Sequence, residues 1–473
     1  FRHKNPRRVK PAEEAGHSAP GHFAAFPVCS QGQVDKSRVS LHPITAASHT
    51  LRITIAQISA AFFYSAFLAL SWRTILENST VNGIGLTSQN VHSFHIPVMG
   101  TGFTIDTPLR VAKFGISSAM SLVDDILIEQ MRKFHCEKEG EEYIKIGDRD
   151  DDSRARRITS YLDLMDLLVK RQVHALQATP FEEGSEITRY FEMLPESPLK
   201  RRYTQMLTSD DTVAREQEQE ELRRLAVPGS IDVNIMTKLD RSQYVDGHKQ
   251  PAEFNDAMAA LRGYAKSTLS SSIVFSAGMN PHLYDYLSTF AEFYPDSDGH
   301  IRKKIVLKVS DYRSALVQGK FLAKRGLWVS EYRIESSLNC GGHAFATKGF
   351  LIGPILEEFR GKRTEFLESV SAVYTKTCLA TSLVPSARIH ETRITVQGGI
   401  GTAEEDAFLM QHYDIHGTGW GTPFLLAPDV VNMDEAHLDK LSSATADDVY
   451  LSATSPLGVP FWSLRNSASE EAR

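Results

Sequence analysis

The hydrophobic pattern of the chain changes near residue 91. From there onward, short apolar runs alternate with stretches in which apolar residues recur every three or four positions. The first pattern predicts buried strands and the second predicts amphipathic helices. Eight strands are predicted, at residues 95–99, 115–122, 231–236, 272–276, 304–309, 327–333, 393–397 and 415–420. Most of them are followed by a predicted helix, at residues 108–114, 255–265, 312–324, 355–377 and 403–412.

Eight βα units in one chain predict an α/β fold, a (β/α)8 TIM barrel whose active site lies in the loops after the strands. One segment departs from a bare barrel. Between the second and third strands, residues 124–226 form a large, mostly helical insertion with charge runs such as DRDDDSRARR. Such runs usually form solvated helix faces. Because the insertion leaves the end of the second strand, a lid at the barrel mouth or an oligomerisation element is the functional alternative.

The chain divides into three parts on this interpretation. Residues 91–430 form the barrel with its insertion, and residues 431–473 form a C-terminal extension to which the sequence assigns no role. Residues 1–90 are expected to be weakly structured or extraneous to the fold. Within them, residues 53–72 are uncharged and long enough to span a bilayer, so a membrane anchor is the alternative.

Composition narrows the classes of function. The chain has 473 residues, of which 42% are hydrophobic and 23% charged, as is ordinary for a globular protein. Its net charge of −6 gives no reason to expect nucleic acid as a partner. The four cysteines form no CxxC pair, so neither a metal site nor a disulfide framework is predicted. We therefore expect a cytoplasmic protein that acts on a small molecule, with a homo-oligomer left open.

The stretch SSLNCGGHAF, residues 336–345, places Gly341, Gly342 and His343 directly after the sixth predicted strand. Glycine pairs allow a backbone to approach a flat or charged group closely, and histidine exchanges protons near neutral pH. A Gly-Gly-His in isolation is more often a plain turn with a surface histidine. The functional interpretation therefore depends on what the neighbouring loops carry.

Two further glycine-rich loops follow the last two strands, VQGGIGT at residues 396–402 and GWGTPF at residues 419–424. Backbone N–H groups in such loops, together with the start of the next helix, bind phosphate well. Loops after strands seven and eight are also the usual phosphate site of phosphate-binding barrels. The predicted phosphate ligands are Gly398, Gly399, Gly421 and Thr422.

Residues 94 to about 430 resemble the nitronate monooxygenase (2-nitropropane dioxygenase-like) family of FMN-dependent TIM barrels, which also includes FMN-dependent enoyl-ACP reductases. The matching pieces are IPVMGTGFTIDTPLRVAKFGISS, DVNIM, VFSAGMNPHL, CGGHAF, ITVQGGIGTAEE and GTGWGTPFLLAPD. The resemblance implies FMN as the cofactor, a small carbon acid as the substrate, and O2 or NAD(P)H as the electron partner. It also implies that His343 is the catalytic, proton-handling residue.

The resemblance further implies that the loop after the first strand lies against the flavin, that Asn234 contacts it, and that the two glycines before His343 give it backbone contacts. Ser276 and Gln397 are predicted to border the pocket. The full set of predicted cofactor contacts besides the phosphate ligands is Met99, Gly100, Asn234, Ser276, Gly341, Gly342 and Gln397. No GxGxxG motif follows a strand, so any nicotinamide must dock at the flavin face directly.

Lys308 in the fifth predicted strand, IVLKVSD, is the second candidate catalytic residue. That strand resembles dihydroorotate dehydrogenase and glutamate synthase barrels more than nitronate monooxygenases. A cation there would stabilise negative charge on a reduced flavin, whereas the alternative is a strand-end lysine that faces solvent. The family also has a shorter lead into its Gly-Gly-His than the IESSLNC of this chain, and it lacks the large insertion.

The sequence thus predicts a flavin-dependent oxidoreductase of the nitronate monooxygenase type. Enoyl reduction with NAD(P)H is the alternative within the same class. A flavin-free phosphate-binding barrel, such as an isomerase or lyase, would share the two phosphate loops. A scaffold protein that interacts through residues 124–226 is the non-catalytic alternative.

Overall fold

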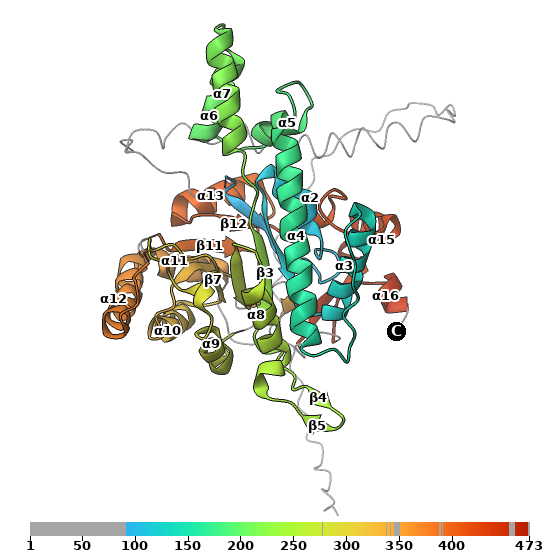
Figure 1. Cartoon of the computed structure of the whole chain (residues 1–473), viewed down its shortest axis with the longest axis vertical. Helices are drawn as coiled ribbons and strands as arrows, with labels where there is room; N and C mark the ends of the chain where they lie inside the picture. Colours follow the sequence, from blue (N-terminus) through green and yellow to red (C-terminus); the bar gives the residue numbers. More distant parts are fainter. Residues whose placement is uncertain are drawn as a thin grey trace, which may run out of the picture. The chain divides into compact units, whose positions relative to one another are not determined.

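Eight parallel strands close into a barrel in the computed structural model of this chain (Figure 1). The structure describes residues 91–473 except 277, 337, 341, 345–350, 387–388, 390, 454–458 and 472–473. Around the barrel the order is β1-β12-β11-β8-β7-β6-β3-β2. These strands are β1 Phe94–Ile96, β2 Ser117–Ser121, β3 Ile231–Met236, β6 Ser272–Ser276, β7 Lys304–Val309, β8 Val329–Ile334, β11 Arg393–Gln397 and β12 Thr418–Gly419. The predicted (β/α)8 fold is confirmed.

Helices connect successive barrel strands, as the alternating pattern predicted. The predicted helix at 355–377 is divided at Lys362 into two helices. The α-helices are α2 Thr107–Val111, α3 Asp125–Glu139, α4 Ser153–Gln177, α5 Glu186–Glu192, α6 Pro198–Leu207, α7 Thr212–Leu225, α8 Asp256–Lys266, α9 Pro281–Leu287, α10 Tyr312–Ala323, α11 Ile352–Gly361, α12 Arg363–Thr381, α13 Ala403–Tyr413, α14 Thr422–Leu425, α15 Glu435–Ser443 and α16 Ala468–Glu471.

Short elements complete the fold. The 3-10 helices are η1 Ala112–Phe114, η2 Ala252–Phe254, η3 Ala291–Phe293 and η4 Ala446–Asp448. Two small antiparallel sheets lie outside the barrel, one of order β4-β5 and one of order β13-β14-β10-β9. Their strands are β4 Tyr244–Val245, β5 His248–Lys249, β9 Asn339–Cys340, β10 His343–Ala344, β13 Val449–Ser452 and β14 Phe461–Leu464.

The two faces of the barrel wall differ in chemistry. Alternate strand residues such as Ile305 and Leu307 join the helices in one large hydrophobic core. The other face is polar in several strands. Arg333 of β8 lies 3.9 Å from the carboxylate of Asp232 in β3, although β6 and β7 separate these strands, so this contact crosses the barrel interior. The interior therefore contains buried charges where such barrels usually hold branched apolar side chains.

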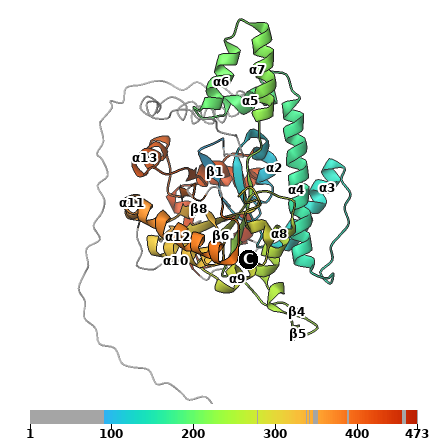
Figure 2. The same ribbon diagram turned by 60° about the vertical axis from the view of Figure 1, so that its left-hand side comes forward.

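Helix α4 of the insertion takes the place of the barrel helix after β2 and packs on α8. The two backbones come close at Gly263, where an added Cβ atom would lie 2.8 Å from the carbonyl oxygen of Ala155 and from Cγ2 of Ile158. Figure 2 shows α4 running beside the barrel strands. The longest helix of the insertion is therefore part of the barrel itself.

Helices α5 to α7 lie at the opposite end of the barrel from its mouth. Tyr190 of α5 donates a hydrogen bond to the carbonyl of Val227, four residues before β3 begins, and its neighbours pack with Ile116, just before β2. Both figures show α6 and α7 far from the β4–β5 hairpin, which follows the carboxyl end of β3 (Figures 1 and 2). These three helices therefore cannot form the lid that was the alternative for the insertion.

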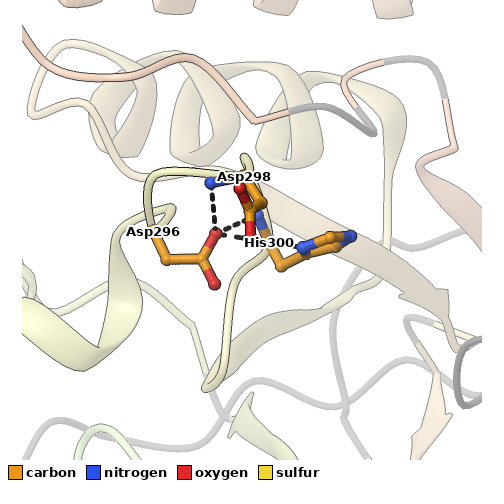
Figure 3. Close-up of side chains that lie close together, drawn as sticks. All are labelled: Asp296, Asp298 and His300. Carbon is orange, nitrogen blue, oxygen red and sulfur yellow. Dashed lines mark hydrogen bonds and ion pairs between the residues drawn. The ribbon is translucent and has the colours of Figure 1, made fainter.

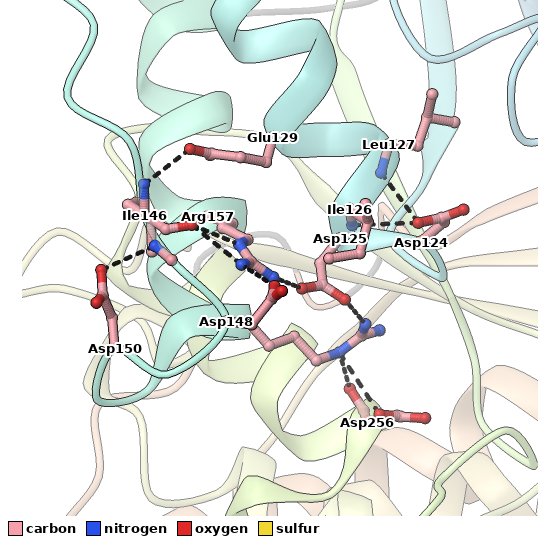
Figure 4. Close-up of polar contacts among 12 residues, drawn as sticks. Asp124, Asp125, Ile126, Leu127, Glu129, Ile146, Asp148, Asp150, Arg157 and Asp256 are labelled. Carbon is pink, nitrogen blue, oxygen red and sulfur yellow. Dashed lines mark hydrogen bonds and ion pairs between the residues drawn. The ribbon is translucent and has the colours of Figure 1, made fainter.

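The prediction that the charge run DRDDDSRARR forms only a solvated helix face is wrong. Its Arg157 is buried and donates to the carboxylates of Asp125 and Asp148 (Figure 4). Its Arg154 donates to the carbonyl of Leu122 after β2 and to that of Asp256. A buried guanidinium needs paired charges and carbonyl acceptors to offset its loss of hydration. The run therefore ties the ends of β2, α3, α4 and α8 together.

An exposed acidic turn precedes β7. Asp296 accepts hydrogen bonds at Oδ1 from the backbone N–H groups of Asp298 and His300, at 3.0 and 2.8 Å (Figure 3). These bonds account for the close approach of the three side chains, and they shape the turn rather than a site. Within the described residues, no helix is long and apolar enough to cross a membrane. The predicted span at 53–72 lies outside the described residues.

Candidate active site

Four polar side chains from four parts of the barrel form one hydrogen-bonded chain at the carboxyl end of its interior. The ammonium of Lys308 at the end of β7 lies 2.8 Å from Oε1 of Glu335, which directly follows β8. Gln397 of β11 donates from Nε2 to the same oxygen at 2.6 Å, and its Oε1 lies 2.9 Å from Nε2 of His95 in β1. The Lys308 side chain is only 14% exposed, so a lysine facing solvent is excluded.

A second set of charges lies deeper in the barrel, beneath these four hydrogen-bonded side chains. Arg333 donates to Glu331 at 2.9 Å, and Thr395 donates to the same carboxylate at 2.7 Å. Burial acts to raise the pKa of Glu331, but the positive charges of Arg333 and Arg393 outweigh it and hold that pKa well below its usual value. The carboxylate of Glu331 is therefore ionised and paired. These paired charges hold the base of the site in a fixed position.

Two buried histidines of the β1 region are neutral. Burial lowers the pKa of His95 to about 3, and the nearby charge of Arg333 adds to this effect. Burial also lowers the pKa of His92 to about 4, although its hydrogen bond with the Phe114 carbonyl opposes the shift. At neutral pH both imidazoles therefore act as uncharged hydrogen-bonding groups.

These two pKa values predict that stability falls in acid. Between pH 6.5, the ordinary pKa of histidine, and pH 4 the unfolded state binds more protons at His92 and His95 than the folded state does. The free energy of unfolding should therefore decrease by about 1.4 kcal/mol per pH unit for each histidine. Urea unfolding at pH 7, 6 and 5 measures the slope. The double variant His92→Gln/His95→Gln should show a shallower slope, and an unchanged slope would contradict the assignment.

The Gly-Gly-His motif forms a β-hairpin, in which His343 of β10 pairs with Cys340 of β9. Gly342 has a φ of +82°, which favours glycine, while Gly341 lies outside the described residues. The position of a Cβ atom on Gly342 would lie 2.8 Å from the ring of Phe461. The space beside this glycine, which was expected to receive a flavin, is therefore filled on that side by an aromatic residue of the C-terminal extension.

The C-terminal extension belongs to the same end of the barrel. Strand β14 adds to β10, with a hydrogen bond from Trp462 N–H to the Gly342 carbonyl at 2.9 Å. The rings of Phe461 and His343 meet edge to face at 4.8 Å. Nearer its start, the extension donates a hydrogen bond from the N–H of Asn432 to the carbonyl of Phe103, in the segment after β1, at 2.8 Å. Residues 431–473 thus help to hold the candidate catalytic histidine, a role that the sequence did not show.

The predicted phosphate loops lie side by side. The N–H of Gly398 donates to the carbonyl of Gly419, and both Gly398 and Gly399 have left-handed φ values of +83° and +73°. Among the described residues, and apart from its own chain neighbours, no atom lies within 4 Å of the Cβ position of either glycine. At Gly421 that position is 3.8 Å from Met99, so the loops after β1, β11 and β12 meet.

Backbone donors remain in these loops after the protein's own hydrogen bonds are formed. The carboxylate of Glu405 accepts from Gly401 and Thr402 and so caps α13. No hydrogen bond from the N–H of Gly399, Gly421 or Thr422 is formed within the described part of the chain. These three amides are the donors that could hold a phosphate group.

The other predicted contacts are less closely joined to this site. Asn234 is buried in β3, and Ser276 of β6 donates its hydroxyl to the Ile235 carbonyl at 3.2 Å. Gly100 is exposed, and its carbonyl accepts from the Thr104 hydroxyl at 2.9 Å. For these residues, flavin contact stays a prediction.

Sequence reasoning missed His95 and Glu335. The stretch EYRIE, residues 331–335, gave a signal, because its charged residues alternate with apolar ones and therefore share one face of a strand. His95 gave no such signal, since only barrel closure brings β1 near β11.

The fold and site together define a (β/α)8 barrel with a buried ionic interior and paired glycine loops at its mouth. No protein-family model matches the sequence, and no curated protein matches it. Among solved structures, the enoyl reductase domain of MlnA from the macrolactin biosynthesis cluster of Bacillus amyloliquefaciens aligns with a TM-score of 0.34 and 17% sequence identity. The alignment covers 55% of this chain and 57% of that one, and a likeness of this extent carries no argument about function.

Proposed function

We propose that this protein is an FMN-dependent oxidoreductase of the nitronate monooxygenase type, acting on a small carbon acid at the carboxyl end of its barrel. The observation that carries the proposal is the meeting of the β1, β11 and β12 loops, with open space beside Gly398 and Gly399. Loops after the seventh and eighth strands are where barrels hold a phosphate. Lys308 lies at the same end of the barrel.

The residues present fit the phosphate of FMN. The amides of Gly399, Gly421 and Thr422 would hold it, and a glycine at 399 leaves room for a phosphate oxygen. When bound, FMN would supply the electron acceptor that the side chains of the protein lack. Proton transfer and the stabilisation of charge would be carried out by side chains of the protein.

Two side chains have proposed roles in that chemistry. His343 would take a proton from the carbon acid, a task suited to an imidazole. The ammonium of Lys308 would stabilise negative charge that develops over the barrel mouth, because a fixed cation in a shielded site needs no reorganisation. Phe461 limits the approach to His343 through its edge-to-face contact.

Two alternatives differ from this proposal in the electron donor or in flavin binding, both of which can be measured. Enoyl reduction would use the same flavin site with NAD(P)H as the electron donor. A flavin-free phosphate barrel is favoured by one observation, the filling of the space beside Gly342 by Phe461. Such a barrel would bind a phosphorylated metabolite at Gly399 and would leave FMN and riboflavin unbound.

The phosphate loop can be tested by substituting Gly399. Gly399→Ala should weaken FMN binding by about tenfold, because the added methyl group enters the open space and the left-handed backbone disfavours alanine. Quenching of FMN fluorescence measures the affinity. Gly361→Ala is the matched control, since its Cβ position is also open but its φ is not left-handed. Equal affinities of the two variants would remove this loop from the site.

A further inference from the structure

The hydrogen-bonded chain at the barrel mouth fixes the tautomer of His95. The Glu335 carboxylate that pairs with the Lys308 ammonium has only acceptor oxygens, so Gln397 turns its NH2 group toward it. The amide oxygen of Gln397 then faces His95 at 2.9 Å, and an oxygen acceptor requires an N–H donor. His95 is therefore the neutral tautomer that carries its proton on Nε2.

The contact between His95 and Gln397 passes over an intervening strand. In the barrel β12 lies between β1 and β11, and Gly419 is the register partner of both His95 and Gln397. A Cβ atom on Gly419 would lie 2.6 Å from Nε2 of His95 and 2.7 Å from Cγ of Gln397. Only glycine at this position leaves room for the two side chains to meet, so the gap in β12 is a requirement of the hydrogen bond.

Each side chain of this hydrogen-bonded network restricts the position of the next. Gln397 can rotate or flip its amide unless both ends are bonded, and His95 bonds the end that does not face Glu335. Lys308 and Gln397 share one oxygen of Glu335, at 2.8 and 2.6 Å, so the place of that oxygen determines the place of the ammonium. A network of this kind is rigid when every buried polar group has a partner.

We infer that His95 is a positioning residue, which through Gln397 and Glu335 fixes the ammonium of Lys308 at the barrel mouth, with Gly419 providing the necessary space. This inference deepens the proposed function, since Lys308 is the cation assigned to that site. His95 itself need not touch a substrate or cofactor. Its effect on chemistry is therefore expected to act through Lys308.

The first test does not require a cofactor. Lys308 in the full chain is labelled with acetic anhydride, and its acetylation rate is followed by peptide mass mapping. The Lys308 nitrogen lies 2.8 Å from the Glu335 carboxylate and must leave that contact before it can attack the anhydride, so His95→Leu and Gly419→Ala should raise the rate by about tenfold. His95→Gln retains an N–H donor and should restore the slow rate. The matched control is His92→Gln, at a buried neutral histidine that bonds the Phe114 carbonyl, and it should leave the rate unchanged.

The second test is a double-mutant cycle on turnover of the FMN-loaded protein. If His95 acts through Lys308, His95→Leu/Lys308→Met should lose no more turnover than Lys308→Met alone. Losses that multiply, or an unchanged acetylation rate in His95→Leu, would overturn the inference. A colourless protein whose acetylation rates change as expected would refute the proposed function while the positioning role of His95 stands. A flavoprotein whose acetylation rates do not change would refute the positioning role of His95, while the proposed function would stand.

Discussion

His343→Gln is expected to lower turnover by roughly 10²- to 10⁴-fold and to leave FMN binding unchanged, which is the usual size of the loss when a general base is removed. The imidazole lies on a hairpin after β8, in edge-to-face contact with Phe461. Glutamine has a similar size and fills the same space beside Phe461, but it cannot accept a proton near neutral pH. Steady-state kinetics with a nitronate, together with the FMN affinity of each variant, measure the effect.

The matched control for this substitution is His412→Gln. His412 lies on α13 with its side chain 43% exposed, stacked on Phe408. Its replacement should change neither turnover nor FMN affinity. Full turnover in His343→Gln would remove this histidine from the mechanism. Loss of FMN binding would instead make it a cofactor contact.

The largest expected effect on stability comes from the barrel interior. Arg333→Met should lower the free energy of unfolding by about 3–5 kcal/mol, because it leaves buried carboxylates without their partner. Arg333 is 2% exposed and bonds Glu331 at 2.9 Å, with Asp232 at 3.9 Å across the barrel. Urea unfolding at pH 7 measures the change.

An exposed ion pair is the control for this prediction. Arg360 and Glu357 lie 2.7 Å apart on α11, with side chains 44% and 52% exposed. Because solvent screens such a pair, Arg360→Met should leave the free energy of unfolding close to that of the unmodified protein. Similar losses in both variants would contradict the claim that the interior charges depend on one another.

Much of the fold could be predicted from the sequence because the strands of a parallel barrel are buried on both faces. Their buried apolar residues stand out in short runs or at alternate positions, and the bounds of β3, β6, β7 and β11 agree with those predicted. The short strands β1 and β12 differ by several residues, since His95 and Gly419 interrupt the apolar pattern there. The placement of α5 to α7 could not be predicted, because the direction of α4 decides at which end they lie.

The candidate site was predictable only in part. Motifs local in sequence, such as the glycine loops, were found after the strands where they were expected. Contacts that need closure of the barrel were not found, because β1 and β11 are some three hundred residues apart and carry no common pattern. The contact of Phe461 with Gly342 was missed for the same reason. Glycine alone does not show whether a ligand or another part of the chain will fill its space.

We propose that the mouth of this barrel holds FMN, and the absorption spectrum of the purified protein is the decisive measurement. A yellow protein is expected, which releases about one FMN per chain on denaturation or takes up added FMN and quenches its fluorescence. Mixing with a nitronate, or with NADH or NADPH, should then bleach the yellow colour. A colourless protein that leaves the fluorescence of added FMN unchanged would show that the barrel mouth does not hold a flavin.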